Sequence, residues 1–318
     1  MKTKLITALT LLIMTHETVS PQSDKKIAAK PAIYTFESDG NGFNTKTFFY
    51  DNGKEVVAFD AQFTEAAGQQ AIDFLKTKTA NPLKWLVVTH PNPDKFNGIP
   101  AFKKAGAKVI MSNLTSNNLK AVHEYKKYYF VNMAKMFTED TYPKLPSADI
   151  TFDEKYTIPL VEGPVELTEL KMAGVSTNQT IASIPSLNAL LVGDLVHYKA
   201  HAWLEGPIVN GQPSYNGKNW ISALKKVSSM FNGSVIVYGG RGESGKISVV
   251  IPEQITYLTS AETIIKTYLN SLEGASLADK KTKVDYSVLT KNFENAFPGY
   301  SLSYMITYGA YGLVASLK

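Results

Sequence analysis

The chain has 318 residues, 44% of them apolar, and its 33 basic and 28 acidic residues give a formal net charge of +5. This length and composition allow a large hydrophobic core and argue against a disordered chain. The basic residues form no dense Lys/Arg block or basic-aromatic stripe, so nucleic acid is not expected as a partner.

The N-terminus has the pattern of a secretory signal peptide, which we place at residues 1–20. Lysines precede an apolar stretch at residues 5–14, and this stretch is too short to span a bilayer. Small residues before Pro21 offer a cleavage site, so we expect cleavage between residues 18 and 24 and a polar leader at 21–31. The protein is then expected to be secreted or periplasmic, without stable membrane insertion after cleavage. The absence of cysteine excludes disulfides and a lipid-anchored N-terminal Cys.

After the leader, the chain opens with strand-like runs separated by Gly-rich turns. These runs predict strands at residues 33–36, 45–50 and 55–59. Apolar residues at helical spacing predict a helix at residues 65–78, and a nearly continuous apolar run predicts a buried strand at 84–89. An opening meander followed by a β-α-β order is therefore expected.

The middle of the chain continues this alternation of helices and strands. A helix is predicted at residues 97–105, closed by Gly106, and a strand at 108–111. A long helix is expected from about residue 116 to 137, and residues 150–172 alternate as a set of short strands.

The last part of the chain is mostly helical. Strands are predicted at residues 189–192 and 234–238, with a helix at 220–230 between them. The tail predicts helices at residues 253–272, 286–296 and 300–318. No obvious linker precedes this tail, and the sequence shows no internal repeat of fixed period.

Three polar segments follow predicted strands. Their sequences are THPNPDKFNG at residues 89–98, GDLV at 193–196 and YGGRGE at 238–243. Because α/β proteins place ligands in the crevice outside the carboxyl ends of their strands, we expect these segments to meet at one site.

In this order, the three segments resemble the metallo-β-lactamase superfamily. Its signature is a Thr-His-x-His-x-Asp-His-x-Gly-Gly segment followed by Gly-His, Gly-Asp and Gly-His-Gly motifs. Asp60 stands at the place of the family's strand-ending aspartate, and residues 193–204 with Trp220 resemble an exported branch. The resemblance implies an α/β fold, the four-layer αββα sandwich, with a metallo-β-lactamase-like domain at residues 32–248. A helical C-terminal extension at 249–318 is expected to pack on this domain.

The residues at the family's metal-binding positions differ from its pattern. Zinc requires imidazoles and carboxylates, with one open position for the water that the metal activates. The resemblance places the first metal at His90, Asn92 and Val175 and the second at Asp94, Lys95 and Arg241, with Asp194 bridging. Valine cannot ligate zinc, Asn is a poor ligand, and the cations Lys and Arg have no free lone pair. The site is therefore degenerate and no cofactor is expected; the alternative is zinc on His90, Asp94 and Asp194.

The two substituted cations stand beside the two retained carboxylates. We therefore expect Lys95 and Arg241 to neutralise Asp94 and Asp194 in place of metal ions. These pairs are either structural ion pairs or a charged pocket that grips a polar ligand. A catalytic Lys95 is disfavoured because two nearby carboxylates would hold its proton.

The histidines have alternative interpretations. His90 is either a residual structural histidine at a strand end or a metal ligand. His197 and His201 either pack at the rim of the site or rebuild part of it with the bridging aspartate. His16, in the leader, and His123, on the predicted long helix, are not candidates for the site.

Three functions are compatible with these observations. The first is a metal-free pseudo-hydrolase that binds a small polar or anionic ligand. The second is a metal-dependent hydrolase of the lactamase or lactonase type that uses a partial site. The third is an interaction module that uses the helical tail as its partner surface. Since the fold does not decide among them, the sequence leaves enzymatic activity open.

Overall fold

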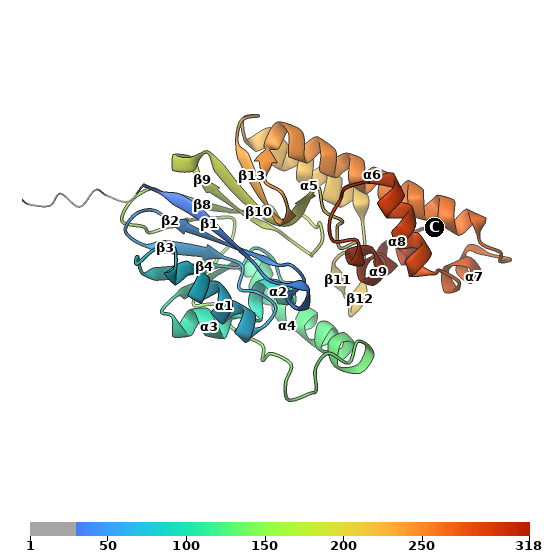
Figure 1. Cartoon of the computed structure of the whole chain (residues 1–318), viewed down its shortest axis with the longest axis horizontal. Coiled ribbons are helices and arrows are strands. Elements are labelled where there is room, and N and C mark those ends of the chain that lie inside the picture. Colours follow the sequence, from blue (N-terminus) through green and yellow to red (C-terminus); the bar gives the residue numbers. More distant parts are fainter. Residues whose placement is uncertain (1–29) are drawn as a thin grey trace, which may run out of the picture.

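The computed structural model describes residues 30–318, in which two six-stranded sheets lie face to face between two layers of helices (Figure 1). The first sheet has the strand order β1-β2-β3-β4-β5-β6. Its strands are β1 (Ala32–Glu37), β2 (Lys46–Asp51), β3 (Val56–Phe59), β4 (Leu83–Val87), β5 (Lys108–Ser112) and β6 (Ile150–Phe152). The expected signal peptide at residues 1–20, and His16 within it, lie outside the described residues, as does most of the leader.

The second sheet has the strand order β14-β13-β10-β9-β8-β7. Its strands are β7 (Lys155–Ile158), β8 (Val165–Glu169), β9 (Thr180–Ile184), β10 (Ala189–Tyr198), β13 (Ile236–Gly242) and β14 (Gly245–Lys246). A separate short hairpin joins β11 (Ile208–Val209) to β12 (Gln212–Pro213). Strands β3 to β6 run parallel to one another, and β10 runs parallel to β13. Parallel neighbours end at the same edge of a sheet, which brings distant segments together there.

Helices cover the outer face of each sheet (Figure 1). On the first sheet these are α1 (Glu65–Lys76), α2 (Pro93–Phe96), α3 (Ile99–Lys104) and α4 (Asn113–Tyr128), which continues as a π-helical turn at Tyr129–Met133. Helix α1 begins where the Thr64 hydroxyl accepts a hydrogen bond from the Ala67 amide, and it buries Ala71 and Leu75 against the sheet. On the second sheet lie α5 (Gly217–Met230) and α6 (Ile247–Ser271), followed by α7 (Leu277–Thr282), α8 (Tyr286–Ala296), α9 (Tyr304–Gly309) and α10 (Tyr311–Ser316). The predicted αββα sandwich with a helical extension is confirmed.

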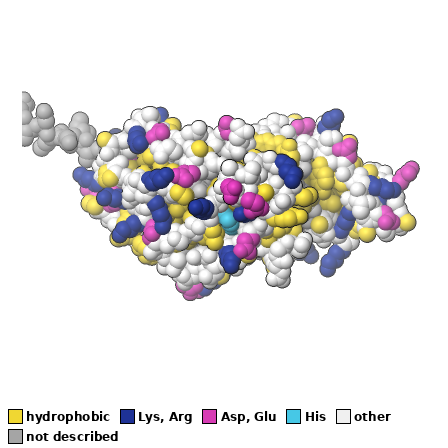
Figure 2. All heavy atoms as spheres, turned by 90° about the horizontal axis from the view of Figure 1, so that it is seen from below, with side chains coloured by type: hydrophobic (Ala, Val, Ile, Leu, Met, Phe, Trp, Pro, Cys, Tyr) yellow, Lys and Arg dark blue, Asp and Glu magenta, His cyan; other side chains and the backbone are white. Residues whose placement is uncertain are grey.

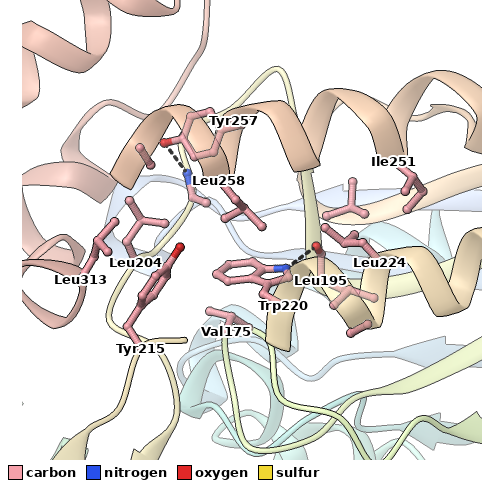
Figure 3. Close-up of a cluster of buried hydrophobic side chains, with 14 of the residues drawn as sticks. Val175, Leu195, Leu204, Tyr215, Trp220, Leu224, Ile251, Tyr257, Leu258 and Leu313 are labelled. Carbon is pink, nitrogen blue, oxygen red and sulfur yellow. Dashed lines mark hydrogen bonds between the residues drawn. The ribbon is translucent and has the colours of Figure 1, made fainter. Parts of the chain in front are cut away.

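The core consists of one apolar layer between the sheets and one on the outside of each sheet. Phe59 and Val87 of the first sheet meet Leu167 and Ile184 of the second in the middle layer. The largest apolar cluster lies on the outer side of the second sheet around Trp220, whose indole N–H donates to the carbonyl of Leu195 at 2.9 Å (Figure 3). This cluster includes residues of the C-terminal helices, namely Leu289, Phe293, Ile306, Leu313 and Val314. The extension therefore shares its core with the sandwich.

Several predicted boundaries were wrong, and two of them concern the polar segments. Strand β10 does not end at Val192 but continues through Gly193 and Asp194 to Tyr198, with shifts in its register against β13. Strand β13 likewise includes the Arg241 segment. Strand β9 and helix α7 were not predicted, the predicted helix at 97–105 is divided into α2 and α3, and α6 begins before its internal Pro252.

The surface of the described residues is mixed in character. Figure 2 shows a face on which positive, negative and apolar side chains alternate, without an extended field of one sign. Within residues 30–318, no helix combines the length and the apolar character that a membrane span requires.

Candidate functional site

Four charged side chains meet at the edge where the strands of both sheets end, and we call Asp94, Lys95, Asp194 and Arg241 the charged cluster. Lys95 Nζ lies 2.8 Å from Asp94 Oδ2 and 2.8 Å from Asp194 Oδ1. Arg241 Nη1 donates to both oxygens of Asp194 at 2.8 and 2.9 Å, and its Nη2 donates to Asp94 Oδ2 at 2.9 Å. Each cation therefore bridges both carboxylates, whereas the sequence predicted only that the two cations would neutralise them.

The remaining donors of Arg241 bind the loop between β1 and β2. Nε donates to the carbonyl of Phe43 at 3.0 Å, and Nη2 also donates to the hydroxyl of Thr45 at 2.9 Å. All three guanidinium nitrogens are therefore engaged by protein acceptors. The Arg241 side chain is only 4% exposed, so it presents little surface to a ligand.

Burial opposes ionisation of the charged cluster, but the opposite charges outweigh it. Burial alone would raise the pKa of Asp94, yet Lys95 and Arg241 hold this pKa at about 2. The same two cations hold the pKa of Asp194 well below its usual range. Both carboxylates in turn raise the pKa of Lys95 despite its complete burial. At neutral pH the cluster therefore carries two positive and two negative charges.

Asp60 lies next to this cluster and behaves differently. Its carboxylate accepts hydrogen bonds from the amide of Thr89 at 2.9 Å and from the Thr89 hydroxyl at 3.0 Å, and it is 4.0 Å from Lys95 Nζ. Burial raises the pKa of Asp60 to about 7, because Lys95 is too far away to offset it fully. Through its two hydrogen bonds with Thr89, Asp60 therefore holds the start of the 89–98 segment in place. Because its pKa is close to 7, it adds at most one negative charge to the surroundings of the charged cluster.

The three histidines of the region are buried and uncharged at neutral pH. His90 Nδ1 hydrogen bonds with the Thr89 hydroxyl at 2.9 Å, and its Nε2 lies 3.8 Å from Asp194 Oδ2. Burial lowers the pKa of His90 to about 4 and that of His197 to about 3. His201 turns away from the charged cluster and hydrogen bonds with the Tyr257 hydroxyl at 3.1 Å.

Two glycines allow this close packing. A Cβ atom at Gly240 would lie 1.8 Å from Asp194 Oδ1, so only glycine leaves room for that carboxylate. Gly193 has a φ of +51°, and a Cβ there would lie 2.5 Å from the Thr89 hydroxyl. The glycines of the GDLV and YGGRGE segments therefore position Asp194 against Arg241.

The other two residues predicted for the site differ in their placement. Asn92 precedes α2, lines the cavity beside the charged cluster and makes no side-chain cap to the helix. Val175 is 2% exposed and packs near Trp220 in the apolar cluster on the outer side of the second sheet (Figure 3). The Val175 side chain therefore contributes to the apolar cluster and offers no polar atom at the family's metal-binding position.

These side chains do not form a zinc site as arranged. Lys95 Nζ occupies the space between the carboxylates that a metal ion would need, and a zinc ion cannot share it with an ammonium group. Across residues 30–318, no group of three or more His, Cys, Asp or Glu side chains is placed to hold a metal ion. The donor set thus fits two side-chain cations instead of zinc.

A small cavity opens beside the charged cluster. Its volume is about 50 Å³, and Asn92, Asp94, Asp194 and Arg241 form its polar side. The opposite wall is apolar and consists of Phe43, Phe63, Phe130, Trp203 and Met305. The cavity has room for a few non-hydrogen atoms only.

A larger groove continues outward from this cavity. Phe43, Phe130 and Trp203 belong to the walls of both. The groove has a volume of about 580 Å³ and runs between the π-helical turn and α9, where Met133, Met136, Tyr304 and Tyr308 line it. A small polar chamber therefore lies at the inner end of a wider apolar groove.

A second buried ion pair borders the cavity. Lys126 of α4 pairs with Glu205, which also accepts hydrogen bonds from Trp203 Nε1 at 2.9 Å and from the Tyr311 hydroxyl of α10. Lys126 Nζ lies 5.4 Å from the centre of the Trp203 ring. This network ties α10 and the wall of the cavity to α4.

The sequence did not predict the roles of Phe43, Thr45, Lys126 and Glu205. Thr45 lies 196 residues from its partner Arg241, and Lys126 lies 79 residues from Glu205. No local pattern indicates such partners, although an unpaired Glu in an apolar segment is a signal for a buried cation elsewhere in the chain.

Comparison with known proteins agrees with this architecture. The sequence model of the metallo-beta-lactamase superfamily matches residues 40–238. Among curated proteins, no sequence gives a significant match.

Several solved structures are similar to the described fold. A metallo-beta-lactamase from Pontibacter korlensis is 19% identical, with a TM-score of 0.55, and the match covers 74% of this chain and 97% of that one. The metallo-beta-lactamase DIM-1, solved after exposure to ceftazidime, is 17% identical, with a TM-score of 0.55 and coverage of 74% and 96%. The enzyme TMB-1 is also 17% identical, with a TM-score of 0.51 and coverage of 73% and 99%. At these identities the likeness concerns the fold.

Proposed function

This chain belongs to the metallo-beta-lactamase superfamily, and we propose that it is a pseudo-hydrolase of that superfamily, which binds a small polar ligand without using a metal ion. The observation that carries the proposal is the position of Lys95 Nζ and the Arg241 guanidinium between Asp94 and Asp194. Two positive side chains there supply the charge that metal ions supply in a zinc enzyme, but they cannot activate a water molecule.

The contacts of the charged cluster favour binding over catalysis. The pKa of Lys95 is raised, so Lys95 keeps its proton and is not a nucleophile or general base at neutral pH. His90 and His197 are buried and have low pKa values. Among residues 30–318, the one hydroxyl within hydrogen-bond reach of His90 is that of Thr89, which donates its hydrogen to Asp60. A polar ligand is favoured over an anionic one because both cations are buried and already paired with carboxylates.

Metal analysis tests this proposal. Protein purified without chelators, and the same protein after incubation with excess zinc, should contain well under one zinc ion per chain by inductively coupled plasma mass spectrometry. It should also leave a chromogenic β-lactam and a lactone unhydrolysed. Stoichiometric zinc together with chelator-sensitive hydrolysis would establish the partial-site hydrolase instead.

We also propose that the protein is exported, on the basis of the lysines and the apolar stretch at residues 5–14. Mass spectrometry of protein from an intact secretory host should then give a new N-terminus between residues 18 and 30. Recovery of a cytosolic chain that begins at Met1 would contradict export.

A further inference from the structure

We infer that the ligand of this pocket is an amphipathic amine, whose ammonium group enters the small cavity and whose apolar body lies in the groove. This inference rests on the proposed binding function and names the ligand class for the same site. It follows from three features: the donors that the charged cluster has already used, the acceptors that it leaves free, and the walls of the groove.

The cations of the charged cluster cannot receive an anion. All three nitrogens of Arg241 donate to Asp194, Asp94, Thr45 or Phe43, and its side chain is only 4% exposed. Lys95 is fully buried between the carboxylates, and its third hydrogen faces Asp60 at 4.0 Å. An anionic head group would have to displace a buried carboxylate, which costs more than a new pair returns.

The free polar atoms of the cavity include a carboxylate oxygen and an amide oxygen, which accept hydrogen bonds, beside the amide nitrogen of Asn92. Asp94 is the most exposed member of the charged cluster, with a side chain that is 12% exposed. Its Oδ2 binds Lys95, Arg241 and Thr45, whereas no described residue donates a hydrogen bond to its Oδ1. The amide of Asn92 lines the same cavity and likewise has no hydrogen bond within the described chain. These atoms are suited to a head group with several N–H donors.

The charges around the cavity are compatible with an added positive charge. The two cations of the cluster are balanced by two carboxylates, and Asp60 adds a further negative charge when it is ionised. Lys126 also lines the cavity, but Glu205 neutralises it through their buried ion pair. The aromatic wall adds to this preference, since the faces of Trp203, Phe43 and Phe130 attract cations.

The groove accounts for the apolar part of the ligand. Its volume of about 580 Å³ fits an aromatic or branched aliphatic body, whereas the cavity of about 50 Å³ admits little more than the head group. Met133 is 66% exposed and Tyr308 is 52% exposed, so both side chains are accessible to a ligand in the groove. Methionine side chains adapt readily to the shape of such a ligand.

The test compares three probes with the same body and different head groups: 2-phenylethylamine, 2-phenylethanol and 3-phenylpropionate. Ligand-detected NMR titrations at pH 7 should give the lowest Kd for the amine, a Kd about 3- to 10-fold higher for the alcohol, and no saturable binding for the carboxylate. Tightest binding by the carboxylate or the alcohol, or no binding by any probe at 10 mM, would overturn the inference.

Two variants locate the binding site. Tyr308→Ala removes an exposed wall of the groove and should weaken amine binding about 3- to 10-fold, whereas Tyr128→Ala, at a tyrosine that is 62% exposed and outside the groove, should leave the Kd unchanged. Asn92→Ala should weaken the amine by a similar factor and, unlike a change of Asp94, does not disturb an ion pair. Equal effects of Tyr308→Ala and Tyr128→Ala would place the amine elsewhere.

Metal analysis of the same samples distinguishes failure of the inferred ligand class from failure of the proposed function. A metal-free protein that fails to prefer the amine refutes the ligand class and leaves the proposed pseudo-hydrolase intact. A protein that carries zinc and hydrolyses lactams refutes the proposed function, whatever its affinity for the amine.

Discussion

Arg241 Nη1 lies 2.8 and 2.9 Å from the two carboxylate oxygens of Asp194, so one guanidinium nitrogen contacts both of them. The other nitrogens of Arg241 bind Asp94, Thr45 and Phe43, so one side chain joins β13, β10, α2 and the loop after β1. A lysine at position 241 could not reproduce this arrangement, because an ammonium group has three donors and no fixed plane. The cluster therefore depends on the shape of the guanidinium group as well as on its charge.

Removal of Arg241 should destabilise the protein strongly. Arg241→Ala leaves Asp194 buried, with Lys95 as the one remaining close cation among the described residues, and such losses cost about 3–5 kcal/mol. Chemical denaturation should show this decrease in the free energy of unfolding. Lys103→Ala provides the control, since Lys103 and Asp149 form an ion pair that is over one-third exposed and should contribute less than about 1 kcal/mol.

The pair Asp194 and Arg241 should also show coupling in a double-mutant cycle. Asp194→Asn with Arg241→Gln removes both charges, so neither buried partner is left alone. The double variant should then lose less stability than the sum of the two single variants, by about 1–3 kcal/mol. Additive losses would mean that the two charges are solvated and that the described pairing is wrong.

Exchange of the two cations for imidazoles should create metal binding. In the variant Lys95→His with Arg241→His, the new side chains join His90, Asp94 and Asp194, which gives the residue types that zinc prefers. We expect about one zinc ion per chain and a melting temperature that rises with zinc concentration as RT ln(1 + [Zn]/Kd) predicts. The variant Lys95→Gln with Arg241→Gln should show neither effect, and an unmodified protein that binds zinc as tightly as the histidine variant would contradict the proposal.

Stability should fall as the pH drops below about 6.5. His90, His197 and His201 have folded pKa values of about 4, 3 and 4, below the value of 6.5 for an exposed histidine, so unfolding takes up protons in this range. Asp60 acts in the opposite direction, because its folded pKa of about 7 means that unfolding releases a proton between about pH 4 and 7. Unfolding therefore takes up about two protons in total. Each of them lowers the free energy of unfolding by about 1.4 kcal/mol for every unit by which the pH falls.

Urea unfolding at pH 5, 6 and 7 measures this dependence. The free energy of unfolding should increase from pH 5 to pH 6. His197→Gln removes one of the protons taken up on unfolding, so it should reduce the slope of this increase by about 1.4 kcal/mol per pH unit. A free energy that is equal at pH 5 and pH 6.5 would show that the histidines are accessible to protons in the folded state.

Glu205 should hold the C-terminal extension in place. Glu205→Ala removes the partner of Lys126 and the acceptor of Trp203 and Tyr311, in surroundings where the Glu205 side chain is only 3% exposed. We expect the free energy of unfolding to fall by about 3–5 kcal/mol. Relative to the unmodified protein, hydrogen exchange should become faster in α10 to a greater extent than in α1. Unchanged exchange in α10 would mean that its apolar contacts alone fix the extension.

The sequence predicted the chemistry of the site better than its surroundings. His90, Asp94, Lys95, Asp194 and Arg241 could be placed together because each follows a strand-like run in a known order of segments. The contacts of Arg241 with Phe43 and Thr45 could not be predicted, since they depend on the path of a loop about 200 residues away in the chain. The environment of Val175 could not be predicted either. The resemblance gave its position in the sequence but not the apolar cluster in which its side chain lies.

The errors in the fold have a similar origin. Gly193 and Asp194 indicated the end of a strand, whereas β10 passes through them with a shift in register that local propensity does not encode. The helix predicted from residue 253 begins at Ile247 instead and contains Pro252 in its second turn, where the missing amide hydrogen leaves one intrahelical hydrogen bond unmade.

The last helices of the chain complete its largest apolar cluster, to which Leu289, Phe293 and Leu313 contribute. The first sheet takes all its strands from residues 32–152, so it is available to fold early in translation. The outer face of the second sheet, by contrast, stays uncovered until a ribosome has synthesised nearly the whole chain. Cells that make this protein must therefore shield the outer face of this sheet until the C-terminal helices have been synthesised.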